Sequence, residues 1–97
     1  MATYVTLLRF TQQGIQNIKQ RPTRLKAAEA AFQAAGSELK QFYLTAGRYD
    51  AVIVSDVPDD ETVAKLALGV GSQGNVRTDT LRAFTEDEYR KIIAALP

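Results

Sequence analysis

The sequence predicts an α+β fold in which the elements follow in the order strand, helix, strand, strand, helix, strand, helix. Three observations support this: four runs rich in β-branched and aromatic residues, apolar residues at helical spacing between them, and a short glycine-containing turn between the second and third runs. This is the order of the ferredoxin-like βαββαβ plait, a four-stranded antiparallel sheet with helices on one face, plus one extra C-terminal helix. We expect residues 1–97 to form a single domain.

The predicted strands are residues 4–10, 38–46, 51–57 and 76–84. The first three are apolar on both faces, which is typical of strands that are buried on both sides. A sheet face this apolar is unsuited to water, and no residues remain in the chain to cover it. We therefore expect a second copy of the chain to pack against it, which predicts a homodimer or a higher homo-oligomer through the sheet.

Residues 11–35 are predicted to be helical, with an interruption at Pro22. Thr11 is a suitable cap for a short first helix, and Pro22 suits the first turn of a second helix that ends at Gly36. Apolar residues seven apart run through both parts, so one kinked helix is an open alternative.

Two further helices begin at recognisable caps. Asp59 follows a proline and is placed as an N-cap, and Thr85 with Glu88 matches a capping box. The last helix is expected to turn its apolar side chains inward, namely Tyr89, Ile92, Ile93 and Leu96.

The segment Gly69–Gly74 (GVGSQG) matches the dinucleotide-binding fingerprint letter by letter. That fingerprint requires a strand before the glycines and a helix after them, on a parallel βαβ unit. Here the glycines follow a helix and precede a strand. We therefore interpret the segment as a glycine-rich helix exit.

Composition excludes several classes of function. The chain has no cysteine and no histidine, which excludes disulfides, thiolate catalysis and the commonest metal ligands, so we expect no metal and no cofactor. With 12 basic and 11 acidic residues, it lacks the one-sided charge of a nucleic-acid-binding protein. We interpret the basic stretch 19–26 as a solvated helix face, with binding of a phosphate or polyanion as the alternative. The N-terminus enters a strand without a leader and no apolar run is long enough to span a membrane, so we expect a cytoplasmic protein.

The turn Gly47-Arg48-Tyr49-Asp50 joins the second and third strands and places a cation, a phenol and a carboxylate together. Glycine suits the positive φ of a tight hairpin, and Asp50 is able to bond turn amides or pair with Arg48, which would be purely structural. Alternatively, Tyr49 and Asp50 present catalytic groups at the rim of a cavity between two sheets. Asp50, Tyr49 and, on the fourth strand, Asp79 are the candidate catalytic residues.

The fourth strand is the polar one, and its hydroxyls and one cation suggest a ligand pocket between the sheets. The candidate ligand-binding residues are Tyr4, Tyr43, Thr80 and Arg82. The alternative is that these side chains only form hydrogen bonds across a dimer interface.

At Gly47–Asp50 the sequence resembles the GYD family, with Arg48 between the family's glycine and its Tyr-Asp pair. Other stretches that match are Tyr4–Gly14, Gly74–Thr78 and Leu81–Thr85, so the similarity covers essentially the whole chain. The resemblance implies the dimeric α/β-barrel superfamily, in which two ferredoxin-like sheets pack back to back. It implies no activity, and heme is disfavoured because a histidine ligand is lacking.

Three functions remain open from the sequence. The first is a homodimeric small-molecule binding or sensing domain with its pocket between the sheets. The second is a cofactor-independent isomerase or monooxygenase-like enzyme on a small organic substrate, with Asp50 or Asp79 as base and Tyr43 or Tyr49 as proton donor. The third is a pure oligomerisation module.

Overall fold

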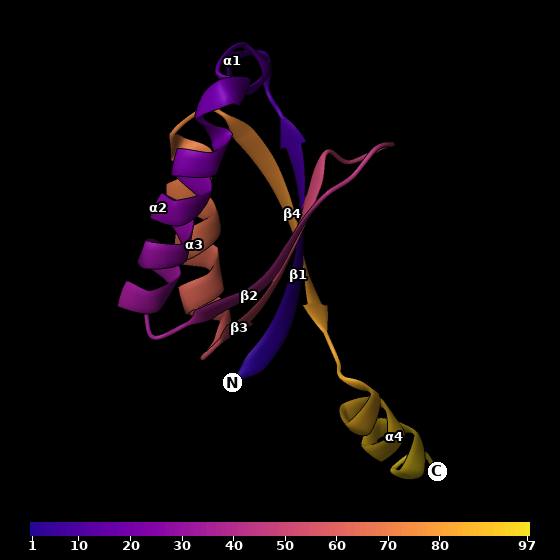
Figure 1. Ribbon diagram of the computed structural model, residues 1–97. Coiled ribbons are helices and arrows are strands. Elements are labelled where there is room, and N and C mark those ends of the chain that lie inside the picture. Colours follow the sequence, from indigo (N-terminus) through magenta and orange to yellow (C-terminus); the bar gives the residue numbers. More distant parts are fainter.

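The computed structural model describes residues 1–97, and its elements follow in the predicted order (Figure 1). The elements are β1 (Ala2–Phe10), α1 (Gln12–Gln16), the 3₁₀ helix η1 (Ile18–Gln20), α2 (Arg21–Ala34), β2 (Glu38–Leu44), β3 (Ala51–Val57), α3 (Asp60–Ser72), β4 (Val76–Ala83) and α4 (Glu86–Ala94).

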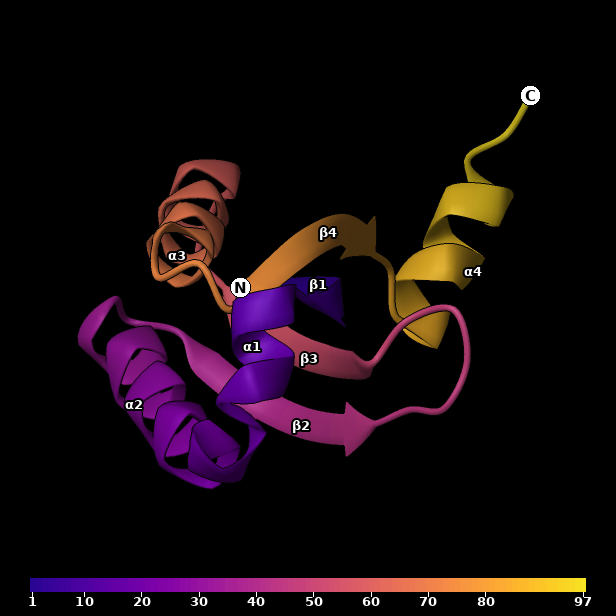
Figure 2. The same cartoon turned by 90° about the horizontal axis from the view of Figure 1, so that it is seen from above.

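The strands form one sheet in the order β2-β3-β1-β4, and all neighbours are antiparallel. Helices α2 and α3 cover one face of this sheet, which we call the helix side, and leave the opposite face open (Figure 2). The predicted ferredoxin-like arrangement is therefore confirmed. The central position of β1 follows from its sequence, because it is apolar on both faces and pairs with β3 on one edge and β4 on the other.

Side chains of β1 alternate between the two faces. Tyr4, Thr6 and Leu8 are buried beneath the helices, whereas Val5 and Leu7 are only half-buried on the open face. The same alternation runs along β3, where every second residue is buried.

The region 11–35 folds as separate helices and not as one kinked helix. The side chain of Thr11 accepts the Gly14 N–H at 3.1 Å and caps α1, and η1 then separates α1 from α2. Pro22 lies in the first turn of α2, where its missing N–H leaves no helical hydrogen bond unmade.

The other predicted caps are also present. Asp59 accepts the Thr62 N–H at 2.8 Å at the start of α3. Thr85 and Glu88 form a complete capping box at the start of α4. These caps satisfy amides that have no partner within the helix.

The core is small for a chain of this length. Only 13 of the 97 residues are buried, and the hydrophobic ones form two clusters. The clusters are Tyr4, Phe32, Val57 and Val63, and Leu8, Ala51, Ile53 and Val76.

The molecule is correspondingly extended. Its accessible surface is 6643 Å², whereas a compact monomer of this mass exposes about 5,500 Å². Its radius of gyration is 14.6 Å, against about 12.5 Å for a compact chain of this length. Roughly 1,100 Å² of surface is therefore left uncovered by the chain itself.

Helix α4 accounts for part of this surface, and the expectation that its apolar residues point inward is wrong. Figures 1 and 2 show α4 projecting beyond the sheet on the side away from α2 and α3. Its apolar side chains are between 45% and 61% exposed, namely Tyr89, Ile92, Ile93 and Leu96. The link after β4 carries the helix beyond the end of that strand, which leaves this apolar surface about half exposed. None of the helices is both long enough and apolar enough to cross a membrane.

Candidate functional site

The open face of the sheet has an apolar centre. Val5 on β1 lies between Val54 on β3 and Leu81 on β4, and Leu7 lies opposite Val52 in the next row. Tyr43 on β2 extends the row beyond β3. These side chains are half-buried or exposed, and no helix lies over them.

One end of this face carries an ion pair. Lys40 Nζ lies 3.1 Å from Asp56 Oδ2, and the Thr3 hydroxyl donates to Asp56 Oδ1 at 3.1 Å. Burial alone would raise the pKa of Asp56, but the hydrogen bonds from Lys40 and Thr3 outweigh it and lower the pKa of this carboxyl. The hydrogen bond to Asp56 in turn raises the pKa of Lys40.

The other end carries a second polar cluster around a shallow hollow of about 330 Å³, which Leu7 and Arg77 also line. The Tyr49 hydroxyl donates to Asp79 Oδ2 at 3.4 Å, and the Arg9 guanidinium lies 4.9 Å from the centre of the Tyr49 ring. An apolar centre between polar ends is the usual composition of a protein–protein interface.

The observed contacts of the Gly47–Asp50 turn mostly serve to hold the turn and the strands together. Gly47 has a φ of 149°, a conformation that favours glycine. The Asp50 carboxylate accepts the Phe10 N–H at 2.8 Å, and the Asp50 N–H donates to the Leu8 carbonyl at 2.8 Å. Asp50 therefore bonds the end of β1, and neither its own turn nor Arg48 is the partner of its carboxylate.

The three candidate catalytic residues are only partly brought together. Tyr49 and Asp79 meet on the open face, whereas the carboxylate of Asp50 is occupied by a backbone amide. Asp79 is also partly exposed to solvent. A general base must reach a proton of the substrate, and the Asp50 carboxylate is already held by the Phe10 N–H.

The four candidate ligand-binding residues do not line one site. Tyr4 and Thr80 lie on the helix side, where the Tyr4 hydroxyl donates to Asp60 and the Thr80 hydroxyl lies 3.3 Å from that of Thr6. Tyr43 lies on the opposite face of the sheet. Thr80 was predicted to bind a ligand, but its hydroxyl is paired with that of Thr6 on the neighbouring strand beneath the helices. Such a pair satisfies the hydrogen bonding of two polar groups that lie on the covered face of the sheet.

Arg82, the fourth of these residues, is occupied within its own chain. Its guanidinium stacks 4.5 Å from the Phe84 ring centre and 5.7 Å from that of Tyr4, and it pairs with Glu88 at 3.6 Å. It thereby ties the start of α4 to the sheet. The hydrogen bond to Asp60 raises the pKa of Tyr4, and burial adds to this.

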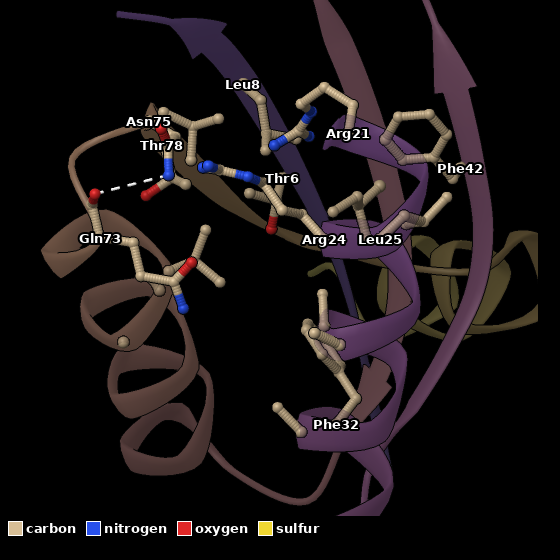
Figure 3. Close-up of a pocket in the computed structure, with 18 of the residues that line it drawn as sticks. Thr6, Leu8, Arg21, Arg24, Leu25, Phe32, Phe42, Gln73, Asn75 and Thr78 are labelled. Atoms are coloured by element: carbon tan, nitrogen blue, oxygen red, sulfur yellow. Dashed lines mark hydrogen bonds between the residues drawn. The ribbon is translucent and has the colours of Figure 1, made fainter. Parts of the chain in front are cut away.

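Sequence reasoning missed a cleft on the helix side. It lies between α2, α3 and the sheet, has a volume of about 260 Å³ and is mostly apolar (Figure 3). Arg21 and Arg24 line one end of it. The available signal was the basic stretch 19–26, for which anion binding was the less favoured alternative to a solvated helix face. Two of its four cations, Arg21 and Arg24, turn toward the sheet.

The match to known proteins agrees with this fold. The model of the GYD domain matches residues 4–93. The chain belongs to the GYD family. The "glutamine synthetase and cystathionine beta-lyase binding protein" of Thermus thermophilus is 32% identical to this chain over 85 residues, which cover 87% of this chain and 90% of that protein.

A solved structure is similar as well. The crystal structure of TTHA0845 from Thermus thermophilus matches with a TM-score of 0.56 and 26% identity, covering 88% of this chain and 95% of that chain. The resemblance seen at Gly47–Asp50 thus identified the family correctly.

Proposed function

We propose that this GYD protein is a protein-binding module, a homodimer that docks onto metabolic enzymes. The observation that carries the proposal is the surface that the chain leaves uncovered, the apolar centre of the open face together with α4. The name of the Thermus relative supports the choice of partner, and it makes glutamine synthetase and cystathionine β-lyase the first candidates.

The open face is the surface we assign to a second copy of the chain. The open face and α4 together leave roughly 1,100 Å² uncovered, which is the scale of a protein–protein interface, about 800 Å² per partner. The face also carries opposite charges at each end, with Lys40 and Asp56 at one and Arg9 and Asp79 at the other. A two-fold axis through its apolar centre would bring such mixed ends together without a net repulsion.

Helix α4 is the surface we assign to the partner enzyme. Tyr89, Ile92, Ile93 and Leu96 follow the spacing i, i+3, i+4, i+7. This is the anchor pattern of an amphipathic helix that lies in a hydrophobic groove of another protein. The helix is stabilised without such a groove by its capping box and by the Arg90–Glu86 ion pair at 2.7 Å.

Three arginine substitutions separate the two surfaces. Leu81→Arg places a charge in the open face, Ile92→Arg places one on α4, and Leu68→Arg is the matched control. Leu81 is 49% exposed and Leu68 on α3 is 73% exposed, so both changes spare the core. Circular dichroism verifies that each variant is folded.

Sedimentation tests the dimer. Burying the exposed half of Leu81 is worth roughly 1–1.5 kcal/mol, and a two-fold interface uses it twice, so Leu81→Arg should weaken dimerisation roughly 30-fold to 150-fold. Leu68→Arg should leave the dimer unchanged. A wild-type monomer at micromolar concentration would contradict the homodimer.

Surface plasmon resonance against purified glutamine synthetase and cystathionine β-lyase of the same organism tests the enzyme partner. Ile92→Arg should abolish measurable binding and leave the dimer intact. If Ile92→Arg instead dissociates the dimer, α4 belongs to the homodimer interface. If neither enzyme binds the wild-type protein, the proposal that this protein docks onto these enzymes is refuted.

The other functions open from the sequence have less support. The residues assigned to a small-molecule pocket between the sheets lie on two different faces, and the carboxylate of Asp50, a candidate base, is held by the Phe10 N–H. A cytoplasmic location stays a prediction.

A further inference from the structure

The cleft on the helix side has an apolar body. Its walls are formed by α2, by α3 and by the buried face of the sheet, and Phe32 lies at one end (Figure 3). The apolar lining comes mainly from Leu25, Ala28, Phe32, Val63, Ala67 and Val70. The alanine side chains that line the cleft on α2 and α3 are too small to fill the space between the two helices. A volume of about 260 Å³ equals that of roughly nine liquid water molecules.

Two guanidinium groups extend into the other end of the cleft. Figure 3 shows Arg21 and Arg24 reaching from the first turns of α2 into the space above Leu8 and Thr6. Across from them, Gln73, Asn75 and Thr78 add polar groups. The cleft is therefore polar and cationic at one end and apolar at the other.

Neither guanidinium has an acidic partner. The ion pairs of the chain involve Lys40, Lys65, Arg82 and Arg90, and no carboxylate lines the cleft. Arg24 donates to the neutral Gln20 side chain at 3.0 Å, and Arg21 lies 4.9 Å from the Phe10 ring centre. Burial, and next the charge of Arg24, lower the pKa of Arg21. Two neighbouring cations without a counterion form a site that an anion would neutralise.

We propose that this cleft binds an amphipathic anion, a monocarboxylate with an aliphatic chain of about six to eight carbons. Its headgroup lies between Arg21 and Arg24, where the planar guanidinium groups match the two oxygens of a carboxylate. Its chain runs between α2 and α3 toward Phe32. The site is on the face of the sheet opposite to the proposed protein-binding surface, so it goes beyond the proposed function and does not depend on it.

Isothermal titration calorimetry with octanoate tests the site on the full-length protein. The double variant Arg21→Gln/Arg24→Gln removes both cations and keeps residues that form helices well. Its matched control is Lys19→Gln/Lys26→Gln, which removes the same charge from positions that do not line the cleft. Octanoate should bind the wild type and the lysine control equally, and the arginine double variant at least a hundredfold more weakly.

Two further ligands separate the contributions of charge and chain. Octanol should bind at least tenfold more weakly than octanoate because it lacks the charge, and acetate should not bind because it lacks the chain. Tighter binding of octyl phosphate than of octanoate would support the anion site and assign its headgroup as a phosphate. Equal binding of octanol and octanoate, or an equal loss in the lysine control, would overturn the proposal.

Amide chemical shifts locate the ligand in the wild-type protein, independently of how the variants fold. Octanoate should shift the resonances of α2, of α3 and of Asn75 to Thr78. Shifts confined to the open face or to α4, or no shifts at millimolar octanoate, would refute the site.

Discussion

Replacing Gly14 by alanine should destabilise the protein, although alanine is the better helix former. Gly14 is buried in α1 and lies against the backbone of Asn75. A Cβ atom added to it would lie 2.0 Å from the Asn75 carbonyl oxygen and 3.0 Å from the carbonyl carbon. That carbonyl is fixed in place, because it accepts the Thr11 N–H at 3.0 Å and the neighbouring Gly74 carbonyl accepts the Thr11 hydroxyl at 2.6 Å.

The magnitude follows from these contacts. Overpacking against a backbone atom costs about 1–3 kcal/mol, and loss of the Thr11–Asn75 hydrogen bond adds about 1 kcal/mol. The higher helix propensity of alanine offsets about 1 kcal/mol of this destabilisation. The net loss for Gly14→Ala is about 1–3 kcal/mol, which lowers the melting temperature of a domain of this size by about 5–20 °C.

Urea and thermal unfolding followed by circular dichroism measure this loss. All variants are compared at one protein concentration, because the proposed dimerisation would make the apparent stability concentration-dependent. Gly71→Ala is the matched control, since nothing lies within 4 Å of its Cβ position on α3. It should be stabilised by about 0.5–1 kcal/mol. A Gly14→Ala protein as stable as the wild type would show that α1 is not clamped to the α3–β4 loop.

Three other substitutions have definite expected outcomes. The hydroxyl of Ser55 is buried without a hydrogen-bond partner, so Ser55→Ala should raise the free energy of unfolding by about 1 kcal/mol in urea, and a comparable loss would reveal a hidden partner. Hydrogen bonds from Thr62 lower the pKa of Asp59 below its ordinary 3.8, so this carboxylate stabilises the fold above that pH and its contribution is lost as the pH falls further. Asp59→Asn keeps a cap that does not titrate and should unfold less steeply with acid below about pH 4, whereas identical acid unfolding curves would contradict this role. The hydrogen bond to Asp60 raises the pKa of Tyr4 above its ordinary 10.0, so this bond stabilises the fold below that pH and is lost as the pH rises further. Tyr4→Phe should therefore remove the most alkaline step from the ultraviolet titration of the tyrosines. An unchanged titration curve would refute this role of Tyr4.

The order and type of the elements were predictable from the sequence because they depend on local patterns. β3 was predicted with its observed bounds, since turn residues flank a run of β-branched residues on both sides. The capping box at Thr85 needs only two side chains three residues apart, so it too is visible without tertiary information.

The faces of the strands were less predictable, because alternation shows which residues share a face and leaves open what lies over it. Thr80 and Tyr43 were assigned to one pocket on the assumption that polar groups mark a ligand site. The structure places Thr80 beside Thr6 under the helices and Tyr43 on the open face. In the same way, the sequence shows that α4 has an apolar stripe, but it does not show whether that stripe packs against the sheet. In the structure the stripe is exposed.

The cleft was not predictable because it depends on how far α2 stands from α3 and the sheet, which no local pattern records. Leu8 of β1 lines the cleft and its neighbour Leu7 faces the open side, so successive residues of one strand serve different surfaces. Leu81→Arg should therefore leave octanoate binding intact, and Arg21→Gln/Arg24→Gln should leave the dimer intact. Any coupling between the cleft and the proposed dimer interface must be reciprocal: an anion that tightens the dimer also binds the dimer more tightly than the monomer.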